Sequence, residues 1–276
     1  MGVKADDIIE YEGFGVSVSE GVLTISLNRP ELGNALPSAA IPQLDALFRQ
    51  IGARADVRVL LIRGEGASFC AGGDVKGFAE TIDHSPEVRR TDYFARMDRA
   101  RSQMEAYLAL QCPVIVACQG AVAGAAVAYP LGADIALAEP GARFVFPHQR
   151  LGLPPDGGLT YLLPRIVGVR KASELALTAA TIDAAEALRI RIVSRIVPAD
   201  VLQQEAFSIA RRIAAAPRGA VRRARALLRE SLAHTASEQL SAERDAIADS
   251  VAEPDFEEGV RAFMDKRRAV FPSTRE

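Results

Sequence analysis

A strand followed by a glycine-rich turn and a helix occurs twice in the first half of the chain. Residues 57–62 form the run VRVLLI, interrupted once by a charge, which leads to the turn CAGGD at 70–74 and a long amphipathic helix at about 87–110. Residues 114–118 form a second apolar run, which leads to a tight turn and a helix of small residues. Apolar runs of this kind suit strands that are covered on both faces of a sheet. The repeated order predicts an α/β fold of stacked units with mainly parallel strands.

The other elements divide the chain into a core and an arm. A hairpin is expected from residues 14–18 and 22–27. A helix with one apolar face is expected at 38–53, and a further strand at 134–138. Helices dominate after Leu159, and the segment PRG at 217–219 is the best candidate for a boundary. We therefore predict a core over residues 1–216 and an arm of amphipathic helices over residues 217–276.

A basic run lies at the start of the predicted arm. It consists of Arg218, Arg222, Arg223, Arg225 and Arg229. We interpret this run as the solvated face of a helix, because long charged side chains usually keep their heads in water. The alternative is a place near the phosphates of a bound coenzyme.

The composition excludes several classes of function. There are 35 acidic and 33 basic residues, a net charge of -2, and no basic stretch is interleaved with aromatic residues, so nucleic acid is not expected as a partner. Residues 1–10 contain three acids and no apolar run, unlike a secretory or transit peptide. Gln119, several glycines and Pro130 interrupt the apolar stretch 114–131, so no membrane span is expected. The 3 cysteines and 3 histidines lack metal-ligand spacing, which indicates a reduced, cytoplasmic protein that binds no metal.

Motifs in a fixed order run along almost the whole chain. They include NRPELGNAL at 28–36, SFCAGGDVK at 68–76, PVIVACQGAVAGA at 113–125, LLPRIVG at 162–168 and EGVRAFMDKR at 258–267. Together they resemble the crotonase (enoyl-CoA hydratase/isomerase) superfamily. Each motif is moderately specific, and their common order makes the resemblance strong. It implies a spiral of β-β-α units with a C-terminal helical arm, and a substrate that is an acyl-coenzyme A (acyl-CoA) thioester.

The two glycine-rich turns are the expected place of the thioester carbonyl. Enolate chemistry needs hydrogen-bond donors where negative charge develops, and backbone N–H groups at tight turns or helix starts provide them. Small residues there let a ligand approach the main chain. The resemblance places the two donors on Gly73 and Ala125, with Ala71 and Asp74 beside the substrate. Without the resemblance, each would be interpreted as a turn residue chosen for its backbone conformation.

The resemblance also implies an assembly of several copies. It predicts a homotrimer or a dimer of trimers, in which the arm serves oligomerisation and completes the active site. Phe263 and Lys266 resemble residues that reach coenzyme A from an adjacent subunit. No cofactor is expected, because coenzyme A is part of the substrate.

Two positions depart from the hydratase branch, in which a pair of glutamates positions and activates water. Ala128 and His148 stand at these positions when the motifs are aligned. Alanine cannot exchange a proton, so hydration by paired carboxylates is disfavoured. Asp156, in LGLPPDGG at 151–158, resembles the acid of the isomerase branches, and its surroundings are most similar to the ring-oxepin (1,2-epoxyphenylacetyl-CoA) isomerase branch.

Both polar residues also have a structural interpretation. An aspartate before Gly-Gly and a helix can be a plain N-cap, and His148 can be a hydrogen-bonded wall residue. We expect an isomerase that shifts a double bond or rearranges a ring on an acyl-CoA through an enolate, with Asp156 as acid and base. His148 could relay a proton. The alternatives are a diketone C–C hydrolase that uses a histidine and an aspartate, a weak enoyl-CoA hydratase, and a non-catalytic acyl-CoA binder.

Overall fold

The computed structural model describes residues 8–73 and 76–274. Its main feature is a seven-stranded sheet. The strands in spatial order are β1 (Ile9–Tyr11), β2 (Phe14–Ser19), β3 (Val22–Leu27), β4 (Val59–Gly64), β5 (Val114–Cys118), β7 (Ile135–Ala138) and β10 (Arg195–Ile196). The first three strands are antiparallel, and the sheet is parallel from β3 to β10. The predicted hairpin and the predominance of parallel strands are confirmed.

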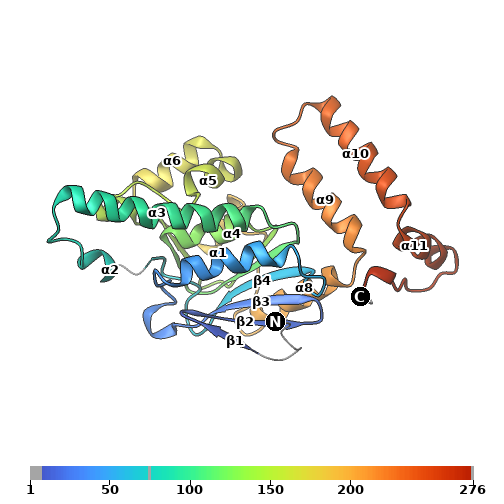
Figure 1. The fold of residues 1–276 in the computed structure, drawn as a ribbon, viewed down its shortest axis with the longest axis horizontal. Helices are drawn as coiled ribbons and strands as arrows, with labels where there is room; N and C mark the ends of the chain where they lie inside the picture. The colour runs from blue at the N-terminus through green and yellow to red at the C-terminus, as the bar shows by residue number, and fades with distance from the viewer. Residues whose placement is uncertain (1–7, 74–75, 275–276) are drawn as a thin grey trace.

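Helices cover both faces of this sheet, as the apolar runs require. On one face lie α1 (Ala40–Ile51), α3 (Pro86–Leu108) and α4 (Ala128–Gly132), and on the other lies α8 (Leu202–Ala214) (Figure 1). Alternate residues of β4 separate accordingly: Leu60 and Ile62 join the first core cluster, and Val59 and Leu61 join the second. This division follows from the two-residue repeat of a strand.

A three-stranded sheet continues the chain beyond β5. It contains β6 (Ala121–Ala123), β8 (Arg143–Val145) and β9 (Thr181–Asp183), and a 3-10 helix, η2 (Gly124–Val127), follows β6 directly. The helix of small residues that the sequence predicts after β5 is therefore partly wrong, because its first residues form a strand. Around this sheet lie η3 (His148–Leu151), α5 (Leu159–Val167), α6 (Val169–Leu177) and α7 (Ala184–Arg189).

Helix α3 is buried only near its C-terminal end. Its buried residues are Gln103, Met104, Ala106 and Tyr107, while most of its first four turns are exposed. The short helix α2 (Lys76–Ala79) precedes it. The expectation of a helix that is amphipathic over its whole length is therefore only partly correct. The exposed half lies beside the cavity described below.

The C-terminal arm projects from one side of the core (Figure 1). It contains α9 (Arg218–Glu230), α10 (Ala236–Val251), α11 (Pro254–Met264) and the short η4 (Pro272–Thr274). The chain leaves α8 at Ala214 and enters α9 at Arg218. The boundary after residue 216 remains a prediction, although the two helices are separated at this place.

Arg225 and Arg229 of α9 attach the arm to the core, so the prediction of a solvated face is wrong for these two residues, whereas Arg222 is exposed. Arg225 is only 8 % exposed; its Nε donates to Asp134 Oδ2 at 2.7 Å, and its Nη1 donates to the Leu110 carbonyl. Arg229 donates to Asp134 Oδ1 at 3.2 Å and to the Leu108 carbonyl at 3.3 Å. These carbonyls lie at the C-terminal end of α3, where cations are favoured because the last carbonyls lack partners within the helix.

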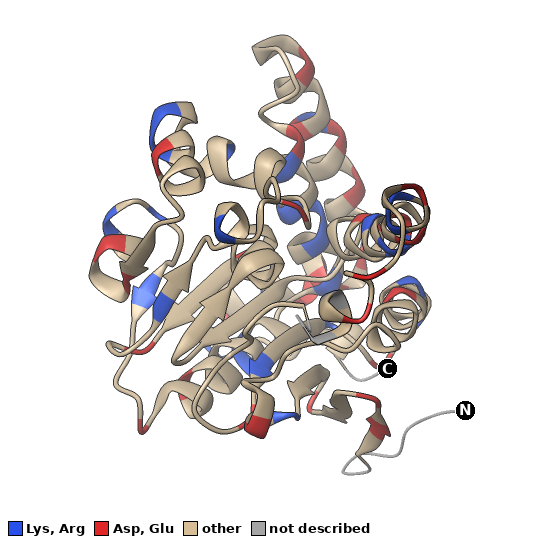
Figure 2. Ribbon diagram, turned by 90° about the vertical axis from the view of Figure 1, so that its left-hand side faces the viewer, with Lys and Arg blue, Asp and Glu red and all other residues tan. Residues whose placement is uncertain are grey.

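Charged residues of both signs are spread over the helices and loops around the sheet (Figure 2). Most of the buried side chains of the described residues are apolar. None of the helices in the described ranges is both long and apolar enough to cross a membrane.

Candidate active site

The two glycine-rich turns are pressed against each other at the ends of β4 and β5. Cys70 N donates to the Ala121 carbonyl at 3.0 Å, and Ala123 N donates to the Cys70 carbonyl at 2.9 Å. Gly72 has a φ of 96°, and a Cβ there would lie 2.8 Å from the Ala123 carbonyl oxygen. Only glycine fits such a conformation and such a contact. The turns that the sequence places 50 residues apart thus form one structural unit.

The NRPELGNAL segment holds the first turn in place. Asn34 is buried, and its Nδ2 donates to the Ser68 carbonyl at 2.7 Å and to the Glu65 carbonyl at 2.8 Å. Leu36 N donates to the Gly72 carbonyl at 2.9 Å. Buried backbone carbonyls need such partners, and Asn34 supplies them from a segment distant in sequence. Sequence reasoning found this motif without finding its structural role.

Both predicted donors line one large cavity. The cavity has an empty volume of about 1230 Å³, including the part open to solvent, and Gly73, Ala125 and Ala71 all lie on its wall. Ala125 is the second residue of η2, so its N–H has no partner within that helix. Asp74, the other predicted substrate-binding residue, lies outside the described residues.

His148 and Asp156 form a polar pair on the wall of the same cavity. His148 Nε2 lies 3.2 Å from Asp156 Oδ1; the histidine side chain is buried, and the carboxylate is partly exposed. Gly157, with a φ of 61°, packs so tightly that a Cβ there would lie 2.8 Å from Ala125 Cβ. The close contact of Gly157 with Ala125 keeps the backbone of Asp156 next to the predicted oxyanion donor.

The surroundings of His148 indicate which nitrogen carries the proton. Its Nδ1 is buried and has no hydrogen-bond partner among the described residues. An unpaired lone pair is less costly than a buried, unpaired N–H. We therefore assign the proton to Nε2, from which it is donated to the Asp156 carboxylate; this tautomer is inferred from the hydrogen-bond network. In this arrangement His148 orients the carboxylate, and Asp156 remains able to accept a proton.

The capping interpretation of Asp156 does not fit the structure. The N-cap of α5 is Gly158, and no side chain caps this helix. Only the backbone carbonyl of Asp156 accepts a hydrogen bond there, from Leu159 N at 3.0 Å. The carboxylate of Asp156 therefore does not cap α5, and the start of this helix does not explain why the carboxylate lies beside the cavity.

The other predicted residues have different positions. Ala128 is fully buried at the start of α4, so no carboxylate stands there. Phe263 lies on α11 and is 83 % exposed, and Lys266 follows that helix and is also exposed. Neither lines the cavity of its own chain. A contact with coenzyme A in an adjacent subunit therefore remains a prediction.

Gln103 is one of several cavity residues that sequence reasoning did not identify. Gln103 on α3 is 4 % exposed and lines the cavity with Met104 and Tyr129. A lone glutamine in a helix rich in charged residues looks like a surface residue. Only its position on the face that packs against α4 could have signalled burial, and the pattern of α3 is too weak to reveal that face.

Comparisons with known proteins agree with this architecture. The enoyl-CoA hydratase/isomerase family model matches residues 17–274. The 1,2-epoxyphenylacetyl-CoA isomerase of Escherichia coli is 34% identical over 255 residues, covering 92% of this chain and 96% of the relative. The crotonyl-CoA hydratase of Syntrophomonas wolfei is 32% identical over 264 residues, covering 95% and 99%.

Solved structures show the same fold. The crystal structure of an enoyl-CoA hydratase from Bacillus anthracis superposes with a TM-score of 0.86 at 31% identity, covering 95% of this chain and 99% of that one. The expected crotonase-like α/β fold is thereby confirmed. Because the family model spans almost the whole chain and the relatives align over nearly their full length, the chain belongs to the enoyl-CoA hydratase/isomerase family.

Proposed function

We propose that this protein is an enoyl-CoA isomerase-like enzyme that acts on an acyl-CoA thioester through an enolate. The observation that carries the proposal is the His148–Asp156 pair, which Gly157 holds against Ala125 at the wall of the cavity. The N–H groups of Gly73 and Ala125 would bind the thioester carbonyl oxygen, and Asp156 would act as the base.

The proposed reaction moves one proton and changes no oxidation state. Asp156 removes a proton from the carbon next to the thioester, and the electron pair of that C–H bond passes into the carbonyl system. The two N–H groups stabilise the negative charge on the carbonyl oxygen. The protonated Asp156 then returns the proton to a different carbon of the conjugated enolate, so a double bond has shifted. No metal or cofactor is needed beyond the coenzyme A of the substrate.

Positive charge near the cavity supports a substrate with phosphate groups. Arg96 and Arg99 on α3 both line the cavity. Arg96 Nη1 donates to the Gly77 carbonyl at 3.1 Å, which ties α3 to the segment after the first turn. Arginine suits phosphate recognition through its planar set of donors.

The side chains of the candidate site favour isomerisation over hydration, whereas the sequence identities of the relatives do not distinguish the two reactions. A hydratase and an isomerase are 32% and 34% identical to this chain, so identity does not choose between them. Ala128 and His148 provide no second carboxylate to activate water. We therefore propose that hydration of crotonyl-CoA is slow.

A second candidate rests on the same polar pair. The notable feature is that the histidine and the aspartate lie within hydrogen-bond distance, as a diketone C–C hydrolase of this superfamily would require. That reaction would need no coenzyme A. A non-catalytic acyl-CoA binder is the third possibility to be tested, and it predicts binding without turnover.

We also propose an oligomeric state and a cellular location for the enzyme. The arm of residues 217–276 would assemble the chain as a homotrimer or a dimer of trimers and would bring Phe263 and Lys266 to a neighbouring coenzyme A. Exposed apolar residues on α11 support this role. The free thiols of Cys70, Cys112 and Cys118 agree with the cytoplasmic location that we propose.

The proposed function is tested by substrate scans and one backbone substitution. Calorimetry with acetyl-CoA and an ultraviolet assay over a series of enoyl-CoA esters separate isomerase, hydrolase and binder. Gly73→Pro removes one N–H donor, and we expect a loss of about 3 kcal/mol of transition-state stabilisation, roughly a hundredfold in kcat/KM. Unchanged turnover in a folded Gly73→Pro variant would contradict the assignment of the oxyanion donors.

A further inference from the structure

Asn34 is a buried residue in the turn after η1 (Pro30–Leu32). Its backbone has a φ of 59°, in the left-handed region, which asparagine tolerates better than most residues. The side chain is 1 % exposed and does not line the cavity, so any effect on a ligand is indirect. Both of its amide hydrogen bonds go to backbone carbonyls just before the first glycine-rich turn, those of Ser68 and Glu65.

The segment around Asn34, residues 33–36, runs along this turn. Three backbone groups of the segment contact residues 70–72 of the turn. The contacts are Ala71 N to the Gly33 carbonyl at 2.8 Å, Cys70 Sγ to the Asn34 carbonyl at 3.1 Å, and Leu36 N to the Gly72 carbonyl at 2.9 Å. Since the Asn34 amide also holds the residues before the turn, it fixes how the whole segment lies against the turn.

The contact with Leu36 sets the direction of the proposed oxyanion donor. The Gly72 carbonyl and the Gly73 N–H belong to one planar trans peptide unit, in which the two groups point in opposite directions. Because the carbonyl points toward Leu36, the N–H of Gly73 points away from segment 33–36. The hydrogen bond to the carbonyl also polarises the unit and makes its N–H a stronger donor.

We propose that Asn34 is a positioning residue for the oxyanion donor Gly73. This inference rests on the proposed function, because it assumes that the Gly73 N–H binds the thioester carbonyl. Without the Asn34 amide, segment 33–36 loses its hold on the residues before the turn, and the peptide unit between Gly72 and Gly73 is free to rotate. Hydrogen bonds weaken steeply when they are poorly aligned. Enolate formation should therefore suffer more than the affinity for coenzyme A esters.

The inference is tested with acetyl-CoA that carries carbon-13 at the thioester carbonyl. Infrared difference spectroscopy measures the stretching frequency of the bound carbonyl, which falls when N–H donors polarise the bond. Exchange of the methyl protons in deuterated water measures enolate formation, and calorimetry measures Kd. A purely structural role of Asn34 would lower Tm without changing the carbonyl frequency, so the frequency decides between the two roles.

The variant is Asn34→Gly, which keeps the positive φ and removes the amide. Asn34→Asp takes its place if Asn34→Gly does not fold, because a protonated carboxyl of the same size offers only one donor. Gln119→Met is the matched control. Gln119 is 7 % exposed and its Nε2 donates to the Gly64 carbonyl at 2.6 Å, so this change also removes a buried amide donor, but from a different segment.

In the natural chain we expect the bound carbonyl to absorb at a lower frequency than the free ester. In Asn34→Gly the frequency should return most of the way to that of the free ester. Exchange should slow about tenfold, less than the roughly hundredfold cost of losing a donor outright. The Kd of acetyl-CoA should change less than about twofold. Gln119→Met should lower Tm and keep the natural frequency and exchange rate.

Two kinds of result would count against the inference. An unchanged frequency in a folded Asn34→Gly, or an equal change in Gln119→Met, would overturn it and leave the proposed function intact. Absence of binding to the natural chain, or binding without a lower carbonyl frequency, would overturn the proposed oxyanion site and the inference together.

Discussion

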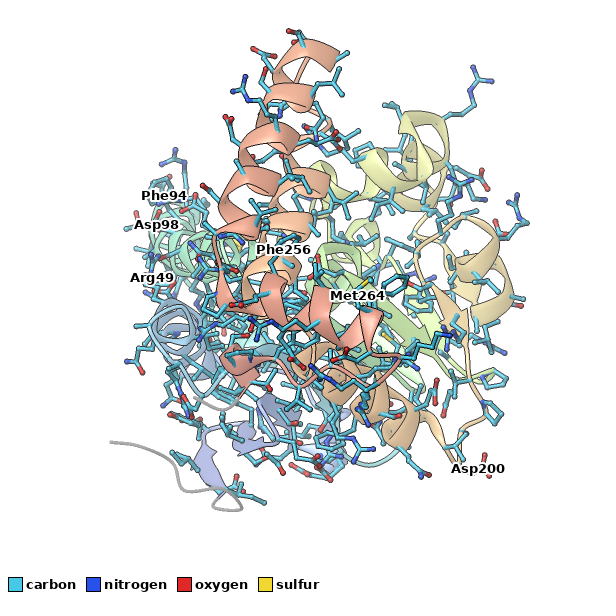
Figure 3. All side chains as sticks on the ribbon, turned by 90° about the vertical axis from the view of Figure 1, so that its right-hand side faces the viewer. Arg49, Phe94, Asp98, Asp200, Phe256 and Met264 are labelled. Carbon is cyan, nitrogen blue, oxygen red and sulfur yellow. The ribbon has the colours of Figure 1, made fainter. Side chains whose placement is uncertain are left out.

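The core of this molecule buries mainly apolar residues, whereas the helices of the arm bury few residues, and two of these are charged. In the core, β5 is apolar and buried at all 5 positions, and charged side chains lie outside. In the arm, α10 has no buried residue at all, α9 buries only Arg225, and α11 buries Asp255 and Ala262. Large apolar residues of α11 are exposed instead, including Met264 at 73 %; Figure 3 labels Phe256 and Met264 on this surface.

This difference shows how each region is stabilised. The core is stabilised by apolar burial, which is non-directional and belongs to one chain. The arm is attached by a few directional contacts, above all between Arg225 and Asp134, and several of its large apolar side chains are exposed in the described structure. Exposed apolar patches of this kind are typical of protein interfaces. The comparison predicts that the arm can be detached or dissociated by changes that leave the core intact.

The largest effect is expected from the attachment point of the arm. Asp134→Ala removes the acceptor of Arg225 and Arg229 and leaves a guanidinium buried without its counter-charge; it also removes the acceptor of Val114 N at the start of β5, at 2.7 Å, so part of the loss falls on the core. We expect a loss of about 3 kcal/mol in the free energy of unfolding, because breaking a buried pair from one side is costly. Urea unfolding measures the loss, and limited proteolysis near residues 231–235 should show earlier release of the arm.

A matched control separates this effect from a general loss of charge. Asp98 pairs with Arg101 Nη2 at 2.9 Å, but both side chains are more than half exposed. Asp98→Ala should change stability by less than about 0.5 kcal/mol. If the two aspartate variants lose equal stability, the arm is not attached through Asp134.

A smaller effect is expected from the apolar surface of α11. Replacing Phe263 and Met264 by serine removes exposed apolar side chains without touching the core. We expect the assembly to weaken at least tenfold, about 1.4 kcal/mol, which is below the gain from burying one such residue fully. Light scattering across a concentration series measures this change. Ile82→Ser, which alters an exposed apolar residue of the core, should leave the assembly unchanged.

The smallest effect concerns a thiol between the two regions. Burial raises the pKa of Cys112 to about 11, an effect that the nearby Arg225 opposes, and burial raises the pKa of Cys70 to about 12. At pH 8 both thiols are protonated and react slowly, since the thiolate is the nucleophile. In Asp134→Ala we expect Cys112 to be alkylated several-fold faster, while Cys70 stays protected. Mass spectrometry of labelled peptides measures this, and equal acceleration of both thiols would indicate global unfolding.

Apolar patterning predicted the core well. The strand at 114–118 was predicted with its observed bounds, because its residues are apolar throughout and Pro113 precedes them. The strand predicted at 57–62 begins two residues later, since pairing of Val59 with Val22 sets its start. Strand β6 was missed because Ala121–Ala123 is short and small, and its pairing with β8 is a tertiary effect.

Polar contacts were the part that sequence could not predict. Arg225 looks like any surface arginine until Asp134, 91 residues away, is placed beside it. The motifs placed Asp156, Gly73 and Ala125 at one expected site, and the structure brings them to one cavity. The hydrogen bond between His148 and Asp156 and the burial of Gln103 at the cavity depend on side-chain directions, which no local pattern contains.

The most direct test of the account is Asp156→Asn, because it removes the proposed base and keeps the size of the side chain. Turnover is followed as the shift of a double bond in enoyl-CoA esters and as exchange of the proton next to the thioester in deuterated water. We predict a fall of at least about a hundredfold in both rates, the lower range for a general base, with ester affinity and Tm little changed. Near-full rates on a good substrate would contradict the account and would make His148 the leading candidate for the base.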